Sequence, residues 1–196
     1  MQIIGKKIKL RKFKNSDIED YIRWMTTDTE WMDWDAPWEE TDFNIDEYRK
    51  NSQLRLEKNR PLSIYDSREI EILATGDHIG RINSYNIDEH CNYTVEEKNL
   101  TIGIDIFSPT HRKKGYATEA WLLHINYLIE NGQENIYTQS WSGNYPVLAL
   151  MKKLGFELIN TKKEYEVVKN KKVDGLTFKL NKEKFLEVLR KWESEE

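Results

Sequence analysis

The fold of this chain is decided by residues 100–117, which read LTIGIDIFSPTHRKKGYA. Apolar residues recur at alternate positions from 100 to 106, which is the period of a half-buried strand, and Pro109 ends that strand because proline cannot donate to a sheet ladder. From Gly115 to Glu130 the apolar residues recur on one helical face, and Asn131-Gly132 is typical of a helix C-terminus. The stretch therefore predicts a strand and a helix joined by a short basic loop.

The loop between this strand and this helix, Arg112 to Ala117, has the features of an anion site. A helix N-terminus presents unpaired backbone N–H groups and a partial positive charge, so consecutive amides can bind a pyrophosphate. Gly115 permits the close backbone approach that such binding needs. Taken alone the pattern is weak, because many helices start with lysines whose charges are solvated. The loop lacks the glycines of a Walker loop or a dinucleotide fingerprint, which excludes both nucleotide classes.

The rest of the chain predicts further strands and helices. Strands are expected at residues 7–13, 62–74, 78–86, 135–141, 156–168 and 175–180, with turns at Thr75-Gly76-Asp77 and Asn170-Lys171-Lys172. Helices are expected behind Asn15-Ser16-Asp17, from near Ile45 to before Pro61, at residues 146–154 and from Asn181. No repeat or Pro/Gly-rich linker interrupts the chain, so we predict a mixed α/β fold around one sheet, in a single domain over residues 1–196.

The composition narrows the classes of function. A formal net charge of −4 argues against a protein that neutralises the phosphates of nucleic acid, and the basic 162–172 hairpin is typical of a solvent-facing strand and turn. The single cysteine, Cys91, allows neither an internal disulfide nor a thiolate zinc site, and the histidines lack metal-ligand spacing, so no metal is expected. No apolar run approaches the ~20 residues that cross a bilayer. We expect a cytoplasmic protein without membrane or nucleic-acid partners, and the sequence leaves open whether it forms a homodimer.

Three motifs together give the loop a specific meaning. They are Arg112-x-x-Gly115-x-Ala117, Trp141-Ser142-Gly143-Asn144 and Lys153-Leu154-Gly155-Phe156, with Asn144 twelve residues before Phe156. In pattern and spacing the chain resembles the GNAT superfamily of N-acetyltransferases from about Ile8 to Leu180, most strongly over residues 100–156. With the stretch from His78 to Asn83, the second motif is most similar to the branch that contains the ribosomal-protein N-terminal acetyltransferases.

This resemblance implies a GNAT-like fold with a mixed central sheet of about seven strands, flanking helices, and two parallel strands, 100–106 and 135–141, that splay apart. It also implies acetyl-CoA as co-substrate, with its pantetheine arm paired to backbone groups of Ile106 and Phe107. The residues implied to hold its pyrophosphate are Arg112, Lys113, Lys114, Gly115, Tyr116 and Ala117. Asn144 would contact the pantetheine or an ordered water, while an asparagine before Pro146 is also a good helix N-cap.

One position departs from the family pattern. Many members carry a tyrosine five residues before the phenylalanine of the Gly-Phe pair, as general acid toward the leaving thiolate, and here that position holds Met151. Met151 lies in an apolar stripe, which favours a place in the core or the acyl pocket. The thiolate would then be protonated by water or by Tyr145. The departure keeps open a second function, that of a non-catalytic module that binds or senses acyl-CoA.

Transfer of an acetyl group to an amine by direct attack requires the neutral amine, whereas α-amines titrate near about 8 and lysine amines near about 10.4 in water. A general base or a desolvated site must therefore assist. The candidates are Asp105 and Glu39, with Glu40 nearby and Ser142 able to orient a water, and spacing alone does not rank them. Asp105 has the alternative of an ordinary outward-facing strand residue.

The segment between Trp24 and Tyr48 is acidic, is interleaved with tryptophans and contains no lysine or arginine. Its carboxylates attract cations, and tryptophan faces bind ammonium groups with about 0.5–2 kcal/mol. In the family that the chain resembles, this segment borders the acceptor site. Trp34, Trp38 and Glu40 are therefore predicted to bind a primary amine that carries extra positive charge, such as a basic peptide N-terminus, a polyamine or an aminoglycoside. The alternative is a solvated loop whose tryptophans cover the core.

Overall fold

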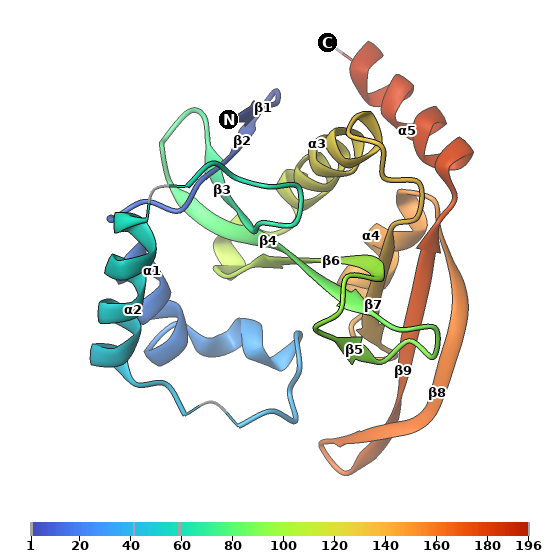
Figure 1. Cartoon of the computed structure of the whole chain (residues 1–196). Coiled ribbons are helices and arrows are strands. Elements are labelled where there is room, and N and C mark those ends of the chain that lie inside the picture. The colour runs from blue at the N-terminus through green and yellow to red at the C-terminus, as the bar shows by residue number, and fades with distance from the viewer. Residues whose placement is uncertain (1, 41, 59, 196) are drawn as a thin grey trace. The chain divides into compact units, whose positions relative to one another are not determined.

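A computed structural model of the chain describes residues 2–40, 42–58 and 60–195 (Figure 1). In this part of the chain nine strands form a sheet in the order β1-β2-β3-β4-β6-β7-β9-β8, and β5 pairs with β4. The strands are β1 (Ile3–Ile4), β2 (Ile8–Arg11), β3 (Arg68–Ile72), β4 (His78–Ile87), β5 (Tyr93–Thr94), β6 (Asn99–Ile106), β7 (Tyr137–Trp141), β8 (Phe156–Val168) and β9 (Lys171–Leu180). The helices are α1 (Asp17–Thr26), α2 (Ile45–Glu57), α3 (Tyr116–Glu130), α4 (Tyr145–Lys153) and α5 (Lys182–Ser194), with short 3-10 helices η1 (Thr29–Asp33) and η2 (Pro109–His111).

The predicted mixed α/β fold is confirmed. The sheet exceeds the expected seven strands by β1 and β5, which have two residues each and are too short to leave a periodic signal in the sequence. The described residues form two compact units. One unit contains the residues up to Ile82 together with Ile104–Leu123, and the other contains Asn83–Gly103 and the residues from His124 onward. The single domain over residues 1–196 stays a prediction.

In the first unit the sheet is antiparallel, with β2 paired to β3 and β3 to β4. Alternate side chains such as Ile8, Leu10 and Ile70 are fully buried, as a half-buried strand requires. Glu69 and Glu71 of β3 point to the other face and are buried as well. Their carboxylates accept hydrogen bonds, because a buried charge without a partner would cost several kcal/mol.

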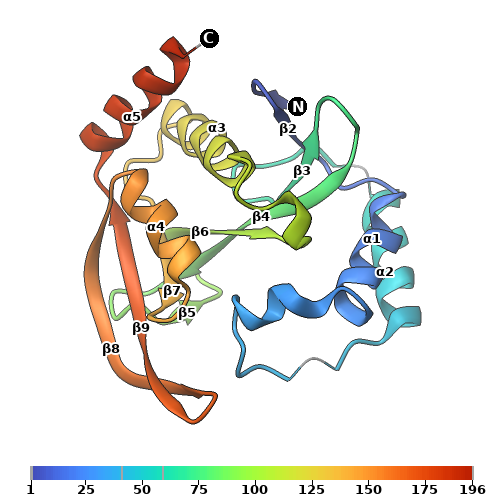
Figure 2. The ribbon, with the colours of Figure 1, turned by 180° about the vertical axis from the view of Figure 1, so that it is seen from behind.

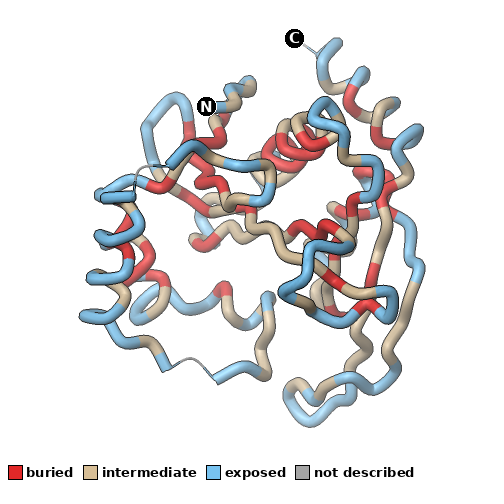
Figure 3. The backbone as a smooth tube through the Cα atoms, viewed as in Figure 1, coloured by how far each residue is buried: buried red, intermediate tan, exposed pale blue. Residues whose placement is uncertain are grey.

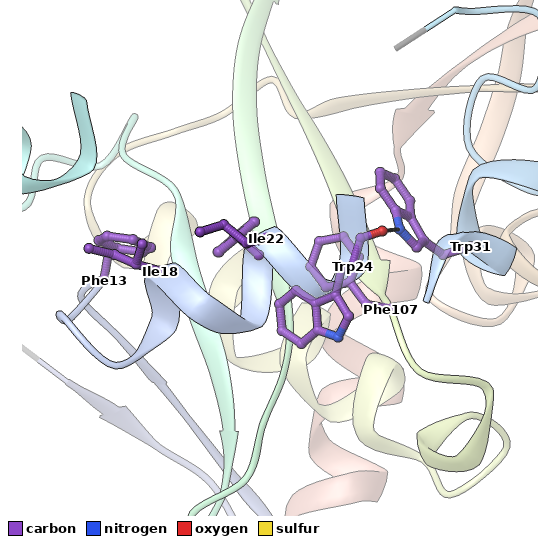
Figure 4. Packing of buried hydrophobic residues seen from close by; sticks show 7 residues of the cluster. Phe13, Ile18, Ile22, Trp24, Trp31 and Phe107 are labelled. Carbon is purple, nitrogen blue, oxygen red and sulfur yellow. Dashed lines mark hydrogen bonds between the residues drawn. The ribbon is translucent and has the colours of Figure 1, made fainter. Parts of the chain in front are cut away.

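An aromatic cluster connects α1 with the end of β6 (Figure 4). The ring of Phe107 stacks on Trp24 at a centroid distance of 4.2 Å and meets Trp31 edge-on at 4.9 Å. Trp31 also donates its indole N–H to the backbone carbonyl of Trp24 at 2.9 Å, which anchors η1 on the C-terminal part of α1. The cluster therefore packs the acidic segment that follows α1 and Phe107, which follows β6, into the same core.

The second unit carries the parallel strand pair. β6 and β7 are parallel, with Thr101 opposite Tyr137, as expected for strands separated by a helical connection. β9 pairs with β7 on one side and with β8 on the other, both antiparallel, and Figure 2 shows β8 and β9 side by side along their length. The helices predicted at residues 146–154 and from Asn181 are confirmed as α4 and α5. An asparagine caps each of them: Asn144 accepts the N–H of Val147, and Asn181 accepts the N–H of Lys184.

Two predicted boundaries are wrong, and in both cases local turn chemistry is the reason. The strand expected at residues 62–74 is limited to β3, because Asp66 accepts the N–H of Ser63 and pairs with Arg60, which closes a turn before the strand. The hairpin turn lies at Lys169-Asn170, which both adopt positive φ, of 49° and 64°. A two-residue turn of this kind matches the twist of the strands, so Lys171 and Lys172 belong to β9. Residues 169–172 are exposed (Figure 3).

Candidate active site

The loop before α3 exposes its backbone to solvent. Lys113, Lys114 and Gly115 are exposed, and α3 begins at the next residue. Gly115 has a φ of 88°, which only a residue without Cβ adopts freely. A Cβ placed there would meet one atom within 4 Å in the described part of the chain, Nζ of Lys7 at 3.8 Å. Gly115 therefore leaves open space beside an ammonium group immediately before the N-terminus of α3, an arrangement that fits an anion.

Lys7 reaches this loop because Glu119, in the first turn of α3, binds the turn between β1 and β2. Its Oε1 accepts the backbone N–H of Lys7 at 2.7 Å and that of Ile8 at 3.3 Å. Gly5 completes the contact, since a Cβ on it would stand 2.3 Å from the same oxygen. Lys7 was absent from the predicted site, and no local pattern could have found it, because this contact joins segments far apart in the sequence.

Arg112 points away from the open side of the loop. Its Nε donates to the carbonyl of Ile106 at 3.1 Å, and its Nη2 donates to the carbonyl of Phe107 at 3.2 Å. Its Nη1 forms an ion pair of 2.6 Å with Glu30 of η1. The backbone N–H of Phe107 donates to Ile79. Arg112 thus fixes the two residues that were predicted to pair with pantetheine.

Asp105 lies on β6 and forms an ion pair with Arg81 of β4, with 3.0 Å between Nε and Oδ2. Its side chain is only 11% exposed, so the alternative of an ordinary outward-facing strand residue is wrong. The two strands approach closely at this point, since a Cβ on Gly80 would stand 2.0 Å from the carbonyl oxygen of Asp105. The Arg81 guanidinium lies 5.8 Å from the ring centre of Tyr21 and 5.9 Å from that of Phe107, so aromatic faces and one carboxylate hold its charge.

Among the described carboxyl groups with a shifted pKa, Asp35 is the one whose pKa is raised toward neutral pH. Surrounding protein atoms reduce the solvation of its carboxylate, and the negative charges of Asp105 and Glu39 act on it more strongly than the positive charge of Arg81 offsets, so its pKa rises to about 7. Water still reaches the residue, which is exposed. Backbone bonds of Asp35 to Trp31 and of Glu39 to Ala36 fix the segment that carries both acids. The sequence placed Asp35 in an acidic run and could not rank it.

The tryptophans of the acidic segment have different roles. Trp31 is buried in the aromatic cluster, so the alternative of a core-covering side chain holds for it. Trp34 and Trp38 are half-buried, and the indole N–H of Trp34 donates to Oε1 of Glu30 at 3.0 Å. Glu39 and Glu40 are exposed. Binding of an acceptor by Trp34, Trp38 and Glu40 stays a prediction.

The predicted residues of the second unit have structural partners there. Ser142 accepts the N–H of Asp174 at 3.0 Å on its Oγ, and its hydroxyl proton is left to donate. Asn144 caps α4, which bears out the alternative stated for it. Met151 is 1% exposed, as a core residue is, and Tyr145 is 73% exposed. The parts of Ser142 and Asn144 in catalysis or cofactor binding stay predictions.

The described residues contain one group with a metal-like arrangement, Asp17, Asp20 and His78, whose ligand atoms lie within 4.8 Å of one another. His78 instead bonds to carboxylates, with Nδ1 3.2 Å from Asp20 and Nε2 3.0 Å from Glu69. Burial alone would lower the pKa of His78, but these hydrogen bonds raise it. Both ring nitrogens of His78 thus lie at hydrogen-bond distance from carboxylates.

The described helices include none with the length and apolar character needed to cross a bilayer. Lysines of the basic hairpin bond within the second unit, where Lys162 donates to the carbonyl of Cys91 and Lys163 pairs with Asp174. These contacts agree with the prediction of an ordinary strand and turn. Cys91 is buried and has a φ of 62°.

Comparison with known proteins gives this geometry its context. The family model described as "Acetyltransferase (GNAT) domain" matches residues 7–157. A search of curated protein sequences gave no match. Among solved structures, an acetyltransferase of the GNAT family from Bacillus anthracis superimposes with a TM-score of 0.69 at 21% sequence identity, over 93% of this chain and 99% of its own.

Two further structures carry names from the ribosomal-protein branch. RimL, a ribosomal L7/L12 alpha-N-protein acetyltransferase in complex with coenzyme A, gives a TM-score of 0.67 at 16% identity, over 91% of this chain and 97% of its own. The ribosomal-protein-S5-alanine acetyltransferase from Vibrio fischeri gives 0.66 at 14% identity, over 91% and 95%. At these identities the likeness concerns the fold.

Proposed function

We propose that this chain, which belongs to the GNAT family of acetyltransferases, transfers an acetyl group from acetyl-CoA to a primary amine of a cationic acceptor, with Asp35 as general base. The observation that carries the proposal is the pKa of Asp35, raised to about 7 beside Asp105 and Glu39. A general base is most effective when its pKa lies near the working pH, because it is then both ionised and basic enough to take a proton.

The basic loop is the proposed site of the cofactor's pyrophosphate. Lys113, Lys114 and Gly115 are exposed at the N-terminus of α3, the Lys7 ammonium lies nearby, and Gly115 leaves room for a phosphate to approach the backbone. We assign Lys7 to this site together with the predicted loop residues Lys113, Lys114, Gly115, Tyr116 and Ala117. Pairing of pantetheine with Ile106 and Phe107, and a contact with Asn144, remain part of the proposal.

Acetyl-CoA, when bound, supplies an acetyl group activated as a thioester, so that a C–N bond to the amine forms as the C–S bond breaks. The acceptor arrives as an ammonium ion at neutral pH. Asp35, ionised above about pH 7, takes the ammonium proton and leaves the nitrogen lone pair free for attack. Asp105, held by Arg81, keeps a negative charge beside Asp35 and maintains its basicity. Tyr145 or water returns a proton to the leaving thiolate.

The acceptor class follows from the charge of the acidic segment. The charges of two carboxylates, Asp105 and Glu39, act on Asp35 together with that of Arg81, so the cluster favours a further cation. Trp34 and Trp38 offer aromatic faces in the same segment. These features support a basic peptide N-terminus, a polyamine or an aminoglycoside. The names of the ribosomal-protein acetyltransferases with this fold make the peptide N-terminus the first acceptor to test.

The test is the pH dependence of the wild-type protein and Asp35→Asn, read as thiol release from acetyl-CoA with a basic peptide, spermidine and an aminoglycoside as acceptors. Wild-type kcat/KM should rise with pH up to about 7 as Asp35 ionises. Asp35→Asn should lower kcat at pH 7.5 by about 10²- to 10⁴-fold, and the deficit should shrink at high pH, where the free amine is abundant.

Asp42→Asn is the matched control, because Asp42 is an exposed acid of the same segment. It should keep the wild-type rate and profile. Asp35→Asn should also be at least as stable as the wild type at pH 8. The folded pKa of Asp35 lies above its ordinary value, so ionising the carboxyl in the folded state opposes folding, and the amide removes this cost. An Asp35→Asn variant with the wild-type pH profile would exclude Asp35 as the base.

A further inference from the structure

We propose that Glu30 is a positioning residue that couples the acceptor segment to the acyl-CoA loop, so that binding of the cofactor orders the segment that receives the amine. This inference rests on the proposed function, since it takes residues 113–117, next to Arg112, as the pyrophosphate site and residues 28–40 as the acceptor side. It assigns to Glu30 a part in the reaction that no motif of the chain indicates.

The geometry of Glu30 is that of a bridge between two segments. Its Oε2 forms the 2.6 Å ion pair with Arg112, and its Oε1 accepts the indole N–H of Trp34 at 3.0 Å. The hydrogen bond from Trp34 and the charge of Arg112 lower the pKa of Glu30, so the carboxylate is ionised at neutral pH. One carboxylate therefore contacts a predicted acceptor residue and a predicted cofactor residue at the same time.

Arg112 extends the bridge into the strand end. Its other two nitrogens donate to the carbonyls of Ile106 and Phe107, the residues proposed to pair with pantetheine. A carbonyl oxygen accepts two hydrogen bonds, so these groups can serve Arg112 and the cofactor together. A ligand that fixes the backbone of Ile106 and Phe107 therefore also fixes the guanidinium of Arg112. Through its ion pair, it then fixes the carboxylate of Glu30 as well.

The strength of the bridge is suited to a coupling role. Glu30 is half-exposed, at 48% of its side chain, and Arg112 is 25% exposed, so the pair is too open to stabilise the fold by much. Such an ion pair holds the two segments together only while both side chains are in place. Coupling between two binding sites typically corresponds to a 5- to 150-fold change in affinity, and an open, hydrogen-bonded ion pair reaches the lower part of that range.

The test is amide hydrogen exchange of the full chain with and without coenzyme A, in the wild type and in Glu30→Gln. Glutamine keeps the shape and can still accept from Trp34, but it loses the charge that holds Arg112. In the wild type, coenzyme A should slow exchange in residues 107–117 and also, by about tenfold, in residues 28–40. In Glu30→Gln the first effect should remain and the second should fall below twofold.

Glu19→Gln is the matched control, because Glu19 pairs with Arg49 at 2.9 Å on the exposed side of α1. It should respond to coenzyme A as the wild type does. Trp34→Phe keeps the ring and removes the N–H, so it should weaken the response of residues 28–40 while that of residues 107–117 persists. Glu30→Gln should raise the acceptor KM more than the acetyl-CoA KM, a split that a general loss of stability does not produce.

The possible failures are distinct. If coenzyme A changed exchange nowhere in residues 107–117 of the wild type, the loop assignment would fail and the inference with it. If those residues responded but residues 28–40 did not, or if Glu30→Gln responded in both segments like the wild type, the loop assignment would stand and the bridge would be refuted.

Discussion

Two clusters of charged residues in the same compact unit differ in their balance of charge. In the first, Arg11 binds Asp17 through two nitrogens, at 2.6 and 2.9 Å, and Glu71 at 2.5 Å, while Lys9 and Lys14 also reach Glu71. In the second, Arg81 is the one cation that acts on Asp35, and its partner Asp105 raises the pKa of Asp35. In the first cluster every carboxylate oxygen of Asp17 and Glu71 contacts a cationic nitrogen, whereas the second has an excess of carboxylates.

The pKa values of Glu71 and Asp35 reflect this difference in charge balance. Burial alone would raise the pKa of Glu71, but hydrogen bonds with Lys14, Lys9 and Arg11 lower it to about 2. The pKa of Asp35 moves the other way, to about 7. A balanced cluster holds Glu71 ionised at every physiological pH and connects β2, β3 and α1, whereas an unbalanced one leaves a group poised to exchange a proton. The difference teaches that charge balance, more than the number of acids, separates a structural cluster from a reactive one.

The largest effect is expected for Arg11→Met. It leaves Asp17, which is fully buried, without its main cation and removes one of the three cations on Glu71, and breaking such a buried pair costs about 3–5 kcal/mol. Urea unfolding should show this loss, while the affinity for acetyl-CoA of the folded variant should stay unchanged. Arg49→Met, which breaks the exposed pair with Glu19, should change stability by less than about 1 kcal/mol. Equal losses in both variants would remove the distinction between the clusters.

A smaller effect, of about one pH unit, is expected for Asp105→Asn. The negative charge of Asp105 raises the pKa of Asp35, so its removal lowers that pKa, and the acid limb of kcat/KM should move to lower pH. Thiol-release rates between pH 5 and 8 measure the shift. Loss of the acid limb together with most of the activity would identify Asp105, rather than Asp35, as the base.

The smallest effect is expected at the rim of the acidic segment. Reversal of charge in the double variant Glu39→Lys/Glu40→Lys should raise the KM of a cationic acceptor by about three- to tenfold at low salt, because both residues are exposed and act through a screened field. The KM for acetyl-CoA should change little, and added salt should reduce the difference. An unchanged acceptor KM would argue against the cationic acceptor class.

Much of the fold could be predicted because its signals are local. The strand at β6, the helix at α3 and the basic loop between them follow from periodicity, a proline and two glycines within one continuous stretch. Asn144 was recognised as an N-cap for the same reason, since the group that it accepts lies three residues away. The hairpin turn was misplaced by a small shift, because Lys169 adopts positive φ without a glycine to announce it.

In the candidate site, too, one part follows from local signals in the sequence and another depends on long-range contacts. The proposed cofactor loop consists of consecutive backbone amides, whose direction is set by the start of a helix, so a motif in the sequence points to it. The proposed base depends on groups from separate segments, because the pKa of Asp35 depends on Asp105 and Arg81, and sequence reasoning named Asp105 and Glu39 while it passed over Asp35.

The sequence by itself determined the class of this protein, an α/β acetyltransferase fold of the GNAT family, and pointed to Arg112 to Ala117 as the proposed acyl-CoA loop. Only the tertiary structure decided which carboxylate is poised near neutral pH, that Lys7 borders the loop, and that Glu30 connects it to Trp34. The physical reason is that the two kinds of effect act between residues at different separations along the chain. Backbone conformation follows from neighbours in the chain, whereas desolvation and Coulomb interactions depend on distances that folding alone creates.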